Sequence, residues 1–208
     1  RPERSQPEVD HATAARATEA RRAAAGRSSR LGQPKALIDV DGRTLIAHLV
    51  QRLLRINDIE ITIVANNDIL ADVYLTCPEA HVVLNPDPEK GRTGSIQCGL
   101  SSILERKGRL PKHVLIVPVD RPGWSVDIVM NLIALSVSAS PVWDGRGGHP
   151  LLLSGDDVNT VYLADCIAPL SSLIEREKID VEFPFLHLNI DTEADLQGLF
   201  LAAKEDWF

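Results

Sequence analysis

The sequence contains, at residues 23–37, the stretch Ala23-Ala24-Ala25-Gly26-Arg27-Ser28-Ser29-Arg30-Leu31-Gly32-Gln33-Pro34-Lys35-Ala36-Leu37. Small residues let a backbone approach a ligand closely, so that several N–H groups can point at one anion. Arg27, Arg30 and Lys35 add positive charge to the same place. The stretch therefore predicts a polyphosphate-binding loop, with a solvated basic surface turn as the alternative. It is neither a Walker loop, because Pro34 precedes Lys35 and Ala36 follows it, nor a dinucleotide-binding Gly-x-Gly-x-x-Gly loop.

This loop pattern, Ala-Ala-Gly-x-Ser-x-Arg-x-Gly-x-Pro-Lys, resembles the signature loop of the molybdenum-cofactor nucleotidylyltransferases. The similarity is greatest to the molybdopterin cytidylyltransferase-like branch of the NTP-transferase superfamily. It implies that Arg30 and Lys35 serve catalysis by stabilising phosphate charge, while Ala25, Gly26 and Ser28 bind the nucleotide. It also implies Mg2+ as cofactor, CTP as the favoured NTP, and a phosphomonoester acceptor such as molybdopterin, with release of pyrophosphate.

Outside the loop, composition limits the class of protein. Residues 1–35 hold eight Lys/Arg and four Asp/Glu, a charge of +4, so the remainder carries −11 of the net −7. An acidic body argues against a nucleic-acid-binding surface. The three cysteines form no Cys-x-x-Cys pair and no apolar run reaches the roughly 18 residues of a membrane span, so we expect a cytoplasmic protein that binds no membrane. The sequence leaves protein partners open.

Strand-like and helix-like segments alternate along the chain after the loop. We expect helices at 43–55, 95–107, 124–138, 168–177 and 195–204, with another starting at 66, and strands at 59–65, 81–84, 113–119 and up to 153. An extended segment at 181–188 completes the pattern. Such alternation is typical of a doubly wound α/β fold, and it predicts a Rossmann-like three-layer sandwich with a mostly parallel sheet. The resemblance to the family covers residues 23–205. It implies a fold of the nucleotide-diphospho-sugar transferase type.

The N-terminal part departs from this pattern. We expect residues 1–16 to be mobile and residues 17–208 to form a single domain. A central parallel strand should precede the loop and should be apolar, yet residues 17–24 include Glu19, Arg21 and Arg22. The first strand is therefore missing, shortened to the alanines, or replaced by a sequence foreign to the fold.

Ligands of such sheets collect beyond the carboxyl ends of the strands. Asn85 follows the strand at 81–84, and Gly94 and Ser95 open the next helix, where N–H groups and the helix dipole favour anions. This segment resembles the family's second nucleotide-binding segment, which implies that Asn85, Gly94 and Ser95 bind nucleotide. The alternative is an ordinary glycine loop with Ser95 as helix cap.

The resemblance also implies a metal site and an acceptor site. Asp120 follows the apolar run 113–119, and the family pattern makes it a Mg2+ ligand, where a turn aspartate is the alternative. Asn189 and Asp191 match the motif that completes the metal site, although Thr192 and Asp195 also form a capping box.

Gly148 and His149 match the family's acceptor-binding segment, while His149 could equally close a turn through its side chain. A zinc site is not expected there, because no second His or Cys lies at ligand spacing.

Two other functions remain open. A sugar- or polyol-phosphate nucleotidylyltransferase would share the phosphate chemistry and differ in its acceptor pocket. A non-catalytic nucleotide-binding or regulatory protein is favoured by the charged segment at 17–24.

Overall fold

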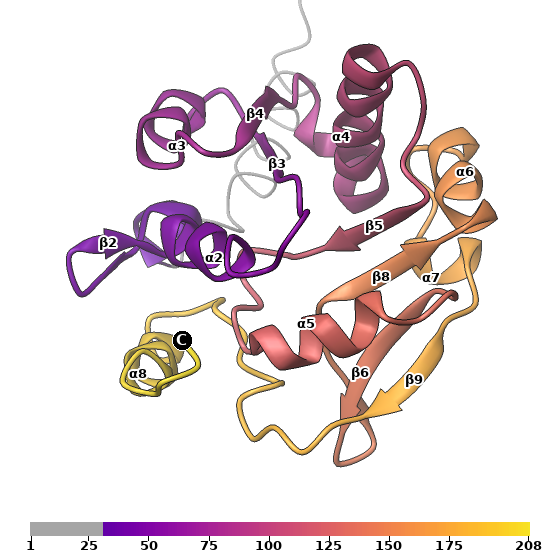
Figure 1. The fold of residues 1–208 in the computed structure, drawn as a ribbon. Coiled ribbons are helices and arrows are strands. Elements are labelled where there is room, and N and C mark those ends of the chain that lie inside the picture. The colour runs from indigo at the N-terminus through magenta and orange to yellow at the C-terminus, as the bar shows by residue number, and fades with distance from the viewer. Residues whose placement is uncertain (1–30) are drawn as a thin grey trace, which may run out of the picture.

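The structure is a computed structural model that describes residues 31–208. In this range the α/β class is confirmed, and Figure 1 shows helices on both sides of the main sheet. The helices are α2 (Leu45–Leu53), α3 (Leu70–Thr76), α4 (Gly91–Lys107), α5 (Val126–Ile133), α6 (Asp156–Leu163), α7 (Leu170–Leu173) and α8 (Asp195–Ala202), with single 3-10 turns at η2 (Lys35–Leu37) and η3 (Pro88–Lys90). None of the helices in the described range is long and apolar enough to cross a membrane.

The strands form two larger groups. β3 (Thr62–Ala65) and β4 (His81–Leu84) pair in parallel, whereas β5 (His113–Ile116), β8 (Leu151–Ser154), β6 (Ala139–Trp143) and β7 (Arg146–Gly147) follow one another in a second sheet. β9 (Glu177–Asp180) adds to β6 in parallel, while β8 is antiparallel to both β5 and β6. β8 runs this way because β7 returns from β6 as a hairpin, without a helical crossover, and a hairpin reverses the chain direction. A short antiparallel pair, β1 (Asp39–Val40) and β2 (Arg43–Thr44), lies before α2.

Alternate residues of the strands reach opposite helix layers. Val114 and Ile116 of β5 pack with buried residues of α4 and α6, while Leu115 packs with the buried face of α5. β3 is covered by the same α4, because Val64 lies against Gly99. One helix layer therefore spans both groups of strands.

The structure corrects most of the predicted boundaries by a few residues. The strand at 81–84 is confirmed, but those expected at 59–65 and 113–119 are limited to β3 and β5. The helices expected at 43–55, 124–138 and 168–177 are shorter. α2 and α5 begin later than expected because Thr44 and Ser125 cap them by accepting hydrogen bonds from Ala47 N and Ile128 N. The helix expected from 66 begins at Leu70, and 181–188 consists largely of turns, because β9 has already ended at Asp180.

The prediction that Ser95 caps a helix was wrong. α4 begins four residues earlier at Gly91, whose positive φ of 72° lets the chain turn directly from η3 into the helix. Ser95 thus lies within the helix, where its Oγ donates to the carbonyl of Gly91 at 2.8 Å. The predicted end at Lys107 is confirmed, followed by Gly108 in the left-handed conformation.

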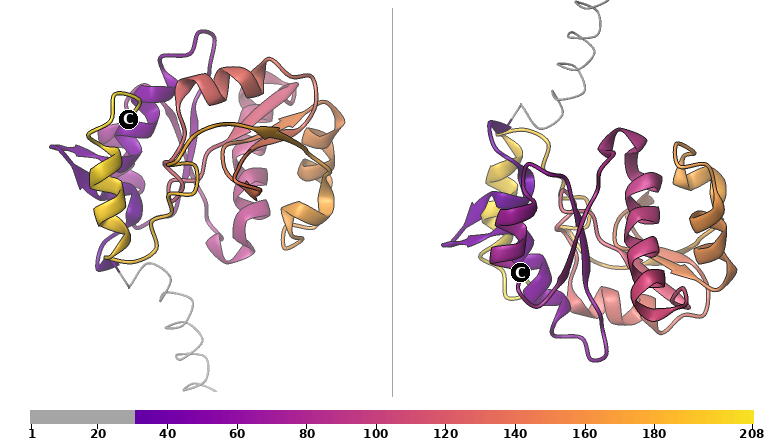
Figure 2. Two further views of the ribbon diagram at one scale, coloured as in Figure 1. Left: turned by 90° about the horizontal axis from the view of Figure 1, so that it is seen from below. Right: turned by 90° about the horizontal axis from the view of Figure 1, so that it is seen from above.

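The C-terminal helix packs beside the first described one. Two views in Figure 2 show α8 alongside α2. Leu199 and Ala202 of α8 share a buried cluster with Leu45 of α2 and with Phe208. The segments 1–16 and 17–24, on which the sequence left open questions, lie outside the described residues.

Candidate active site

Three charged side chains from distant parts of the chain meet at one place. The Lys35 ammonium lies 2.6 Å from Asp191 Oδ1 and 3.8 Å from Asp120 Oδ2. Lys35 opens η2 directly after Pro34, Asp120 follows β5, and Asp191 precedes α8. The Lys35 side chain is 16% exposed, that of Asp120 29% and that of Asp191 50%, so the cluster is open toward solvent on the Asp191 side. Two carboxylates are thus held around one cation.

Backbone hydrogen bonds fix the two carboxylate loops to each other. Ile190 N donates to Asp120 O at 2.9 Å. Asp195 Oδ2 accepts from Asp191 N at 2.9 Å, from Thr192 N at 2.7 Å and from Thr192 Oγ1 at 2.9 Å, and these bonds lower the pKa of Asp195. Only one of the two hydrogen bonds of the expected capping box forms. The Thr192 N–H donates to the Asp195 carboxylate, but the Thr192 side chain does not accept a hydrogen bond from the start of α8. The loop before α8 is therefore held in a defined shape.

The donor atoms around Lys35 suit a hard divalent cation. The Asn189 amide nitrogen donates to Asp191, and together with the stronger hydrogen bond from Lys35 this lowers the pKa of Asp191. The Asn189 amide oxygen is buried with no hydrogen-bond partner in the described structure. Mg2+ prefers oxygen ligands and is usually bound by one or two carboxylates together with substrate phosphates. Residues 31–208 contain no group of three or more His, Cys, Asp and Glu placed to hold a metal.

Of the described residues expected to bind nucleotide, Asn85 directly follows β4, whereas Gly94 and Ser95 lie near the start of α4. Asn85 is 7% exposed, and its amide donates to Ser95 Oγ at 3.1 Å and accepts from Asp87 N at 3.0 Å. Gly94 lies in the first turn of α4, where a Cβ would come within 2.5 Å of Lys90 Cβ. The structure thus brings Asn85 and Ser95 into direct contact, and the contact fixes the start of α4 to the end of β4.

Asn66 was missed by the sequence analysis, which treated it as a helix start. It follows β3 directly and neighbours Asn85, whose N–H donates to Ala65 O at 2.7 Å. Its side-chain oxygen is buried without a hydrogen-bond partner in the described residues. Its position directly after a β-branched strand, as for Asn85, was the signal that could have identified it.

His149 lies close to several charges. Burial, and next the charges of Arg92 and Arg121, lower its pKa to about 4, against the opposing effect of Asp120; Arg176 lowers it further. The imidazole is therefore neutral at pH 7 and is surrounded by arginines. None of its ring nitrogens forms a hydrogen bond within residues 31–208, in contrast to the turn-closing alternative.

Gly148 is required by packing. A Cβ at this position would lie 2.4 Å from Leu186 Cγ, and its N–H donates to Pro141 O at 2.8 Å. The predicted contacts of Gly148 and His149 with an acceptor stay predictions. The loop residues Ala25, Gly26, Arg27, Ser28 and Arg30 lie outside the described part of the chain.

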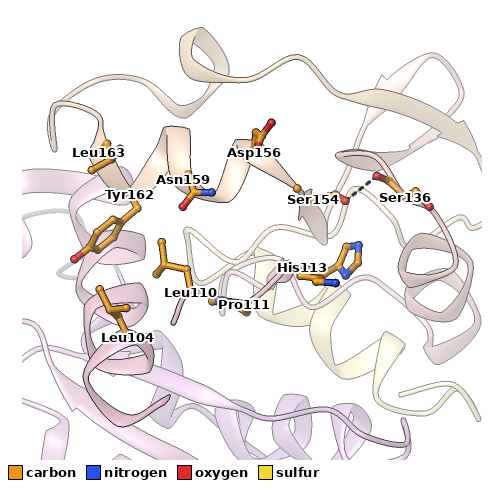
Figure 3. A pocket seen from close by; sticks show the side chains of 12 residues that line it. Leu104, Leu110, Pro111, His113, Ser136, Ser154, Asp156, Asn159, Tyr162 and Leu163 are labelled. Atoms are coloured by element: carbon orange, nitrogen blue, oxygen red, sulfur yellow. Dashed lines mark hydrogen bonds between the residues drawn. The ribbon is translucent and has the colours of Figure 1, made fainter. Parts of the chain in front are cut away.

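A cavity of about 730 Å³ lies elsewhere (Figure 3). His113, the first residue of β5, and Ser154, the last of β8, are among its lining residues, with Leu104, Leu110 and Tyr162 from neighbouring segments. Asp120 follows the opposite end of β5, and none of the predicted site residues within 31–208 lines the cavity. The cavity is therefore separate from the cluster around Lys35.

Comparisons with solved structures agree with the three-layer fold. A Mycobacterium tuberculosis Rv0371c homolog from Mycobacterium sp. strain JC1 is 20% identical with a TM-score of 0.68, covering 86% of this chain and 92% of that one. The manganese complex of Rv0371c from M. tuberculosis H37Rv is 16% identical with a TM-score of 0.65, covering 84% and 94%.

Comparisons with sequences are more specific. A molybdenum cofactor guanylyltransferase of Rhizobium meliloti is 30% identical over 176 residues, 78% of this chain and 77% of that protein. A nicotine blue oxidoreductase of Paenarthrobacter nicotinovorans is 30% identical over 146 residues, 62% and 67%. Residues 23–179 match the family model of the MobA-like NTP transferase domain. Since this match spans most of the chain, the protein belongs to the MobA-like NTP transferase family and is a nucleotidyltransferase.

Proposed function

We propose that this nucleotidyltransferase uses Mg2+ to transfer NMP from an NTP to a phosphomonoester acceptor and releases pyrophosphate. The observation that carries the proposal is the Lys35 ammonium between the carboxylates of Asp120 and Asp191. Two carboxylates next to a triphosphate would repel it, so the arrangement suits phosphate chemistry only with cations present. The similarity to a molybdenum cofactor guanylyltransferase of Rhizobium meliloti supports a molybdopterin-type acceptor.

The reaction needs no nucleophile from the protein. An oxygen of the acceptor phosphate attacks the α-phosphorus in line, a new P–O bond forms, and the bond to the bridging oxygen of the β-phosphate breaks. The electron pair leaves with pyrophosphate. Lys35 and Arg30 stabilise the charge that grows on the phosphoryl oxygens and the leaving group.

Asp120, Asp191 and Asn189 would hold the divalent cation. When bound, Mg2+ supplies charge neutralisation and orientation of the phosphates. The exposed face of Asp191 leaves a side open toward ligand oxygens, and the unpartnered oxygen of Asn189 is a further donor. The manganese complex of the related Rv0371c structure supports a divalent cation in this fold.

Different residues would bind the nucleotide and the acceptor. We assign Asn66, Asn85, Gly94 and Ser95 to the nucleotide, together with Ala25, Gly26 and Ser28, which the resemblance of the loop assigns to it. A polar amide pair at two adjacent strand ends is suited to base or ribose hydrogen bonds.

On the acceptor side, neutral His149 can donate a hydrogen bond to a phosphate, and Arg92, Arg121 and Arg176 contribute positive charge. Gly148 admits Leu186 behind this segment and so fixes the position of His149.

The sequence and the relatives disagree on which nucleotide base the NTP carries. The Ala-Ala-Gly form of the loop favours CTP, whereas the name of the Rhizobium meliloti relative points to GTP. We propose CTP because the loop is the segment that the resemblance assigns to the nucleotide. We also place the protein in the cytoplasm, since Cys77, Cys98 and Cys166 are all free thiols.

Pyrophosphate release tests the proposal. Purified protein is incubated with each of CTP, GTP, ATP and UTP, with molybdopterin, a sugar phosphate or a polyol phosphate, and with Mg2+ or Mn2+. Metal-dependent release with CTP and molybdopterin is the expected result. Release with GTP would overturn the base, release with a sugar or polyol phosphate would overturn the acceptor, and nucleotide binding without release from any pair would indicate a non-catalytic protein.

A further inference from the structure

Arg52 on α2 is a fully buried cation. Its side chain is 0% exposed, and none of the carboxylates in residues 31–208 lies within ion-pair distance of it. Three aromatic rings surround the guanidinium, with centroids at 4.0 Å for Trp124, 4.9 Å for Phe208 and 5.4 Å for Trp207. Burial and, less strongly, the charge of Arg55 lower the pKa of Arg52 to about 9, so it remains a cation at neutral pH.

The guanidinium donates to one short loop. Its Nη1 donates to Trp124 O at 2.7 Å and its Nη2 to Pro122 O at 3.0 Å. This is the loop that begins at Asp120. Its other side is pressed against the chain at Phe185, because a Cβ on Gly123 would lie 1.8 Å from Phe185 O. The loop is thus clamped between α2 and the segment that leads to Asn189.

An apolar side chain would fill this space at lower cost. Removing an unpaired cation from water is expensive, even where aromatic rings and carbonyl dipoles offset part of the loss. What arginine supplies, and Met or Leu cannot, is a rigid planar fork with two donors for two carbonyls of one turn. The free-energy cost of burying the Arg52 cation is explained if the protein needs this turn held in one geometry.

The turn is connected to both carboxylates of the candidate site. Asp120 is two residues before Pro122, and its own carbonyl accepts from Ile190 N, next to Asp191. Movement of the turn would therefore change the separation of the Asp120 and Asp191 side chains.

We propose that Arg52 is a positioning residue, which holds the Asp120 carboxylate at the distance from Asp191 that divalent-cation binding requires. Arg52 acts through the Pro122 and Trp124 carbonyls and touches no substrate. This inference rests on the proposed function, since it gives the two carboxylates a shared cation. Changes in groups that orient metal ligands cost about tenfold to a hundredfold in metal affinity, which sets the expected effect.

The test measures Mn2+ binding by electron paramagnetic resonance, with a non-hydrolysable CTP analogue present and no acceptor. Arg52→Lys keeps the charge but loses the fork. The matched control is Trp207→Leu, which removes one ring from the same guanidinium and leaves both carbonyl hydrogen bonds. Thermal melts of both variants are recorded, and binding is measured well below the lower melting temperature.

We expect Arg52→Lys to weaken Mn2+ binding by at least about tenfold and Trp207→Leu to bind within about twofold of wild type at a similar loss of melting temperature. Equal Mn2+ affinity in the two variants would overturn the inference and assign Arg52 to stability alone. If Arg52→Lys does not fold, Arg52→Gln replaces it, because its uncharged amide can still donate to one of the carbonyls.

The binding measurement separates this inference from the proposed function. Wild-type protein that binds Mn2+ through Asp120, as shown by its loss in Asp120→Asn, but releases no pyrophosphate would refute the reaction and leave the role of Arg52 intact. Wild-type turnover together with normal Mn2+ binding by the Arg52 variants would support the reaction and refute the role of Arg52. Wild-type protein without Asp120-dependent Mn2+ binding would overturn both.

Discussion

Replacing Lys35 by Ala should change metal binding and catalysis in opposite directions. In the structure the Lys35 ammonium occupies the space between Asp120 and Asp191, at 3.8 and 2.6 Å from their oxygens. A divalent cation that binds the same oxygens must displace it. Removing Lys35 therefore removes a competitor, and Mn2+ should bind more tightly when nucleotide is absent.

The size of this gain follows from the exposure of the ion pairs. The Asp191 side chain is half exposed, and pairs of this kind contribute about 0–1 kcal/mol. Since 1.36 kcal/mol is about tenfold, Mn2+ affinity should rise by up to about fivefold. For the same reason Lys35→Ala should change the free energy of unfolding by no more than about 1 kcal/mol.

Turnover should fall at the same time. A donor aimed at charge that develops in the transition state is worth about 3 kcal/mol or more, so the rate of pyrophosphate release should drop by about 100-fold or more. Titration calorimetry with Mn2+ and the pyrophosphate assay measure the two effects on the same preparation.

Lys107→Ala is the matched control. Lys107 also forms an ion pair, with Glu60, but it lies in the last turn of α4 and away from the site. It should leave both Mn2+ affinity and rate unchanged. Weaker Mn2+ binding in Lys35→Ala would show that Lys35 does not compete with the cation, and an unchanged rate in folded protein would reject its role on the phosphates.

Three further predictions follow from single residues. Asp120→Asn should keep the melting temperature within a few degrees and abolish Mn2+-dependent pyrophosphate release, because an amide is a poorer ligand for a hard cation; wild-type metal dependence would contradict this. Gly148→Ala should destabilise the fold by about 1–3 kcal/mol in chemical denaturation, since its Cβ would overlap Leu186, while Gly147→Ala, with no atom within 4 Å of its Cβ, should not. The folded-state pKa of His149 is about 4, below its unfolded value, so the unfolded state binds a proton first as pH falls. The free energy of unfolding of the wild type should therefore decline from about pH 6.5 to 4, and that of His149→Gln should decline less. Parallel pH curves for the two proteins would refute this prediction.

The sequence predicted where the strands end better than where the helices begin. Asn85 was found because an apolar run precedes it, and it directly follows β4; Asp120 was expected at the end of a strand at 113–119, but β5 ends at Ile116 and Asp120 lies in a turn four residues later. The start of α4 was predicted wrongly, because a serine after glycine is typical of a helix cap, whereas the positive φ of Gly91 sets the start. That conformation depends on the turn before it and cannot be deduced from residue preference.

The candidate site could be predicted only through resemblance. Lys35 and Asp191 are 156 residues apart, and no local pattern indicates that they meet. In the sequence, Arg52 cannot be told from an exposed polar residue of an amphipathic helix, because the sequence does not show which loop packs against it. Asn66 and the arginines near His149 were missed for the same reason, because their neighbours are distant in sequence.

The contact between the two ends of the described chain also affects when the protein can fold during synthesis. Ile38 and Val40 lie at one end of the sequence, yet they complete their buried cluster only with Ile190, Leu199 and Phe208. Such long-range contacts slow folding, because a large loop must close before they form. During synthesis, Ile38, Val40 and Leu45 therefore lack their C-terminal partners until Phe208 has left the ribosome. Chaperone dependence of the nascent chain should accordingly persist until translation passes Phe208.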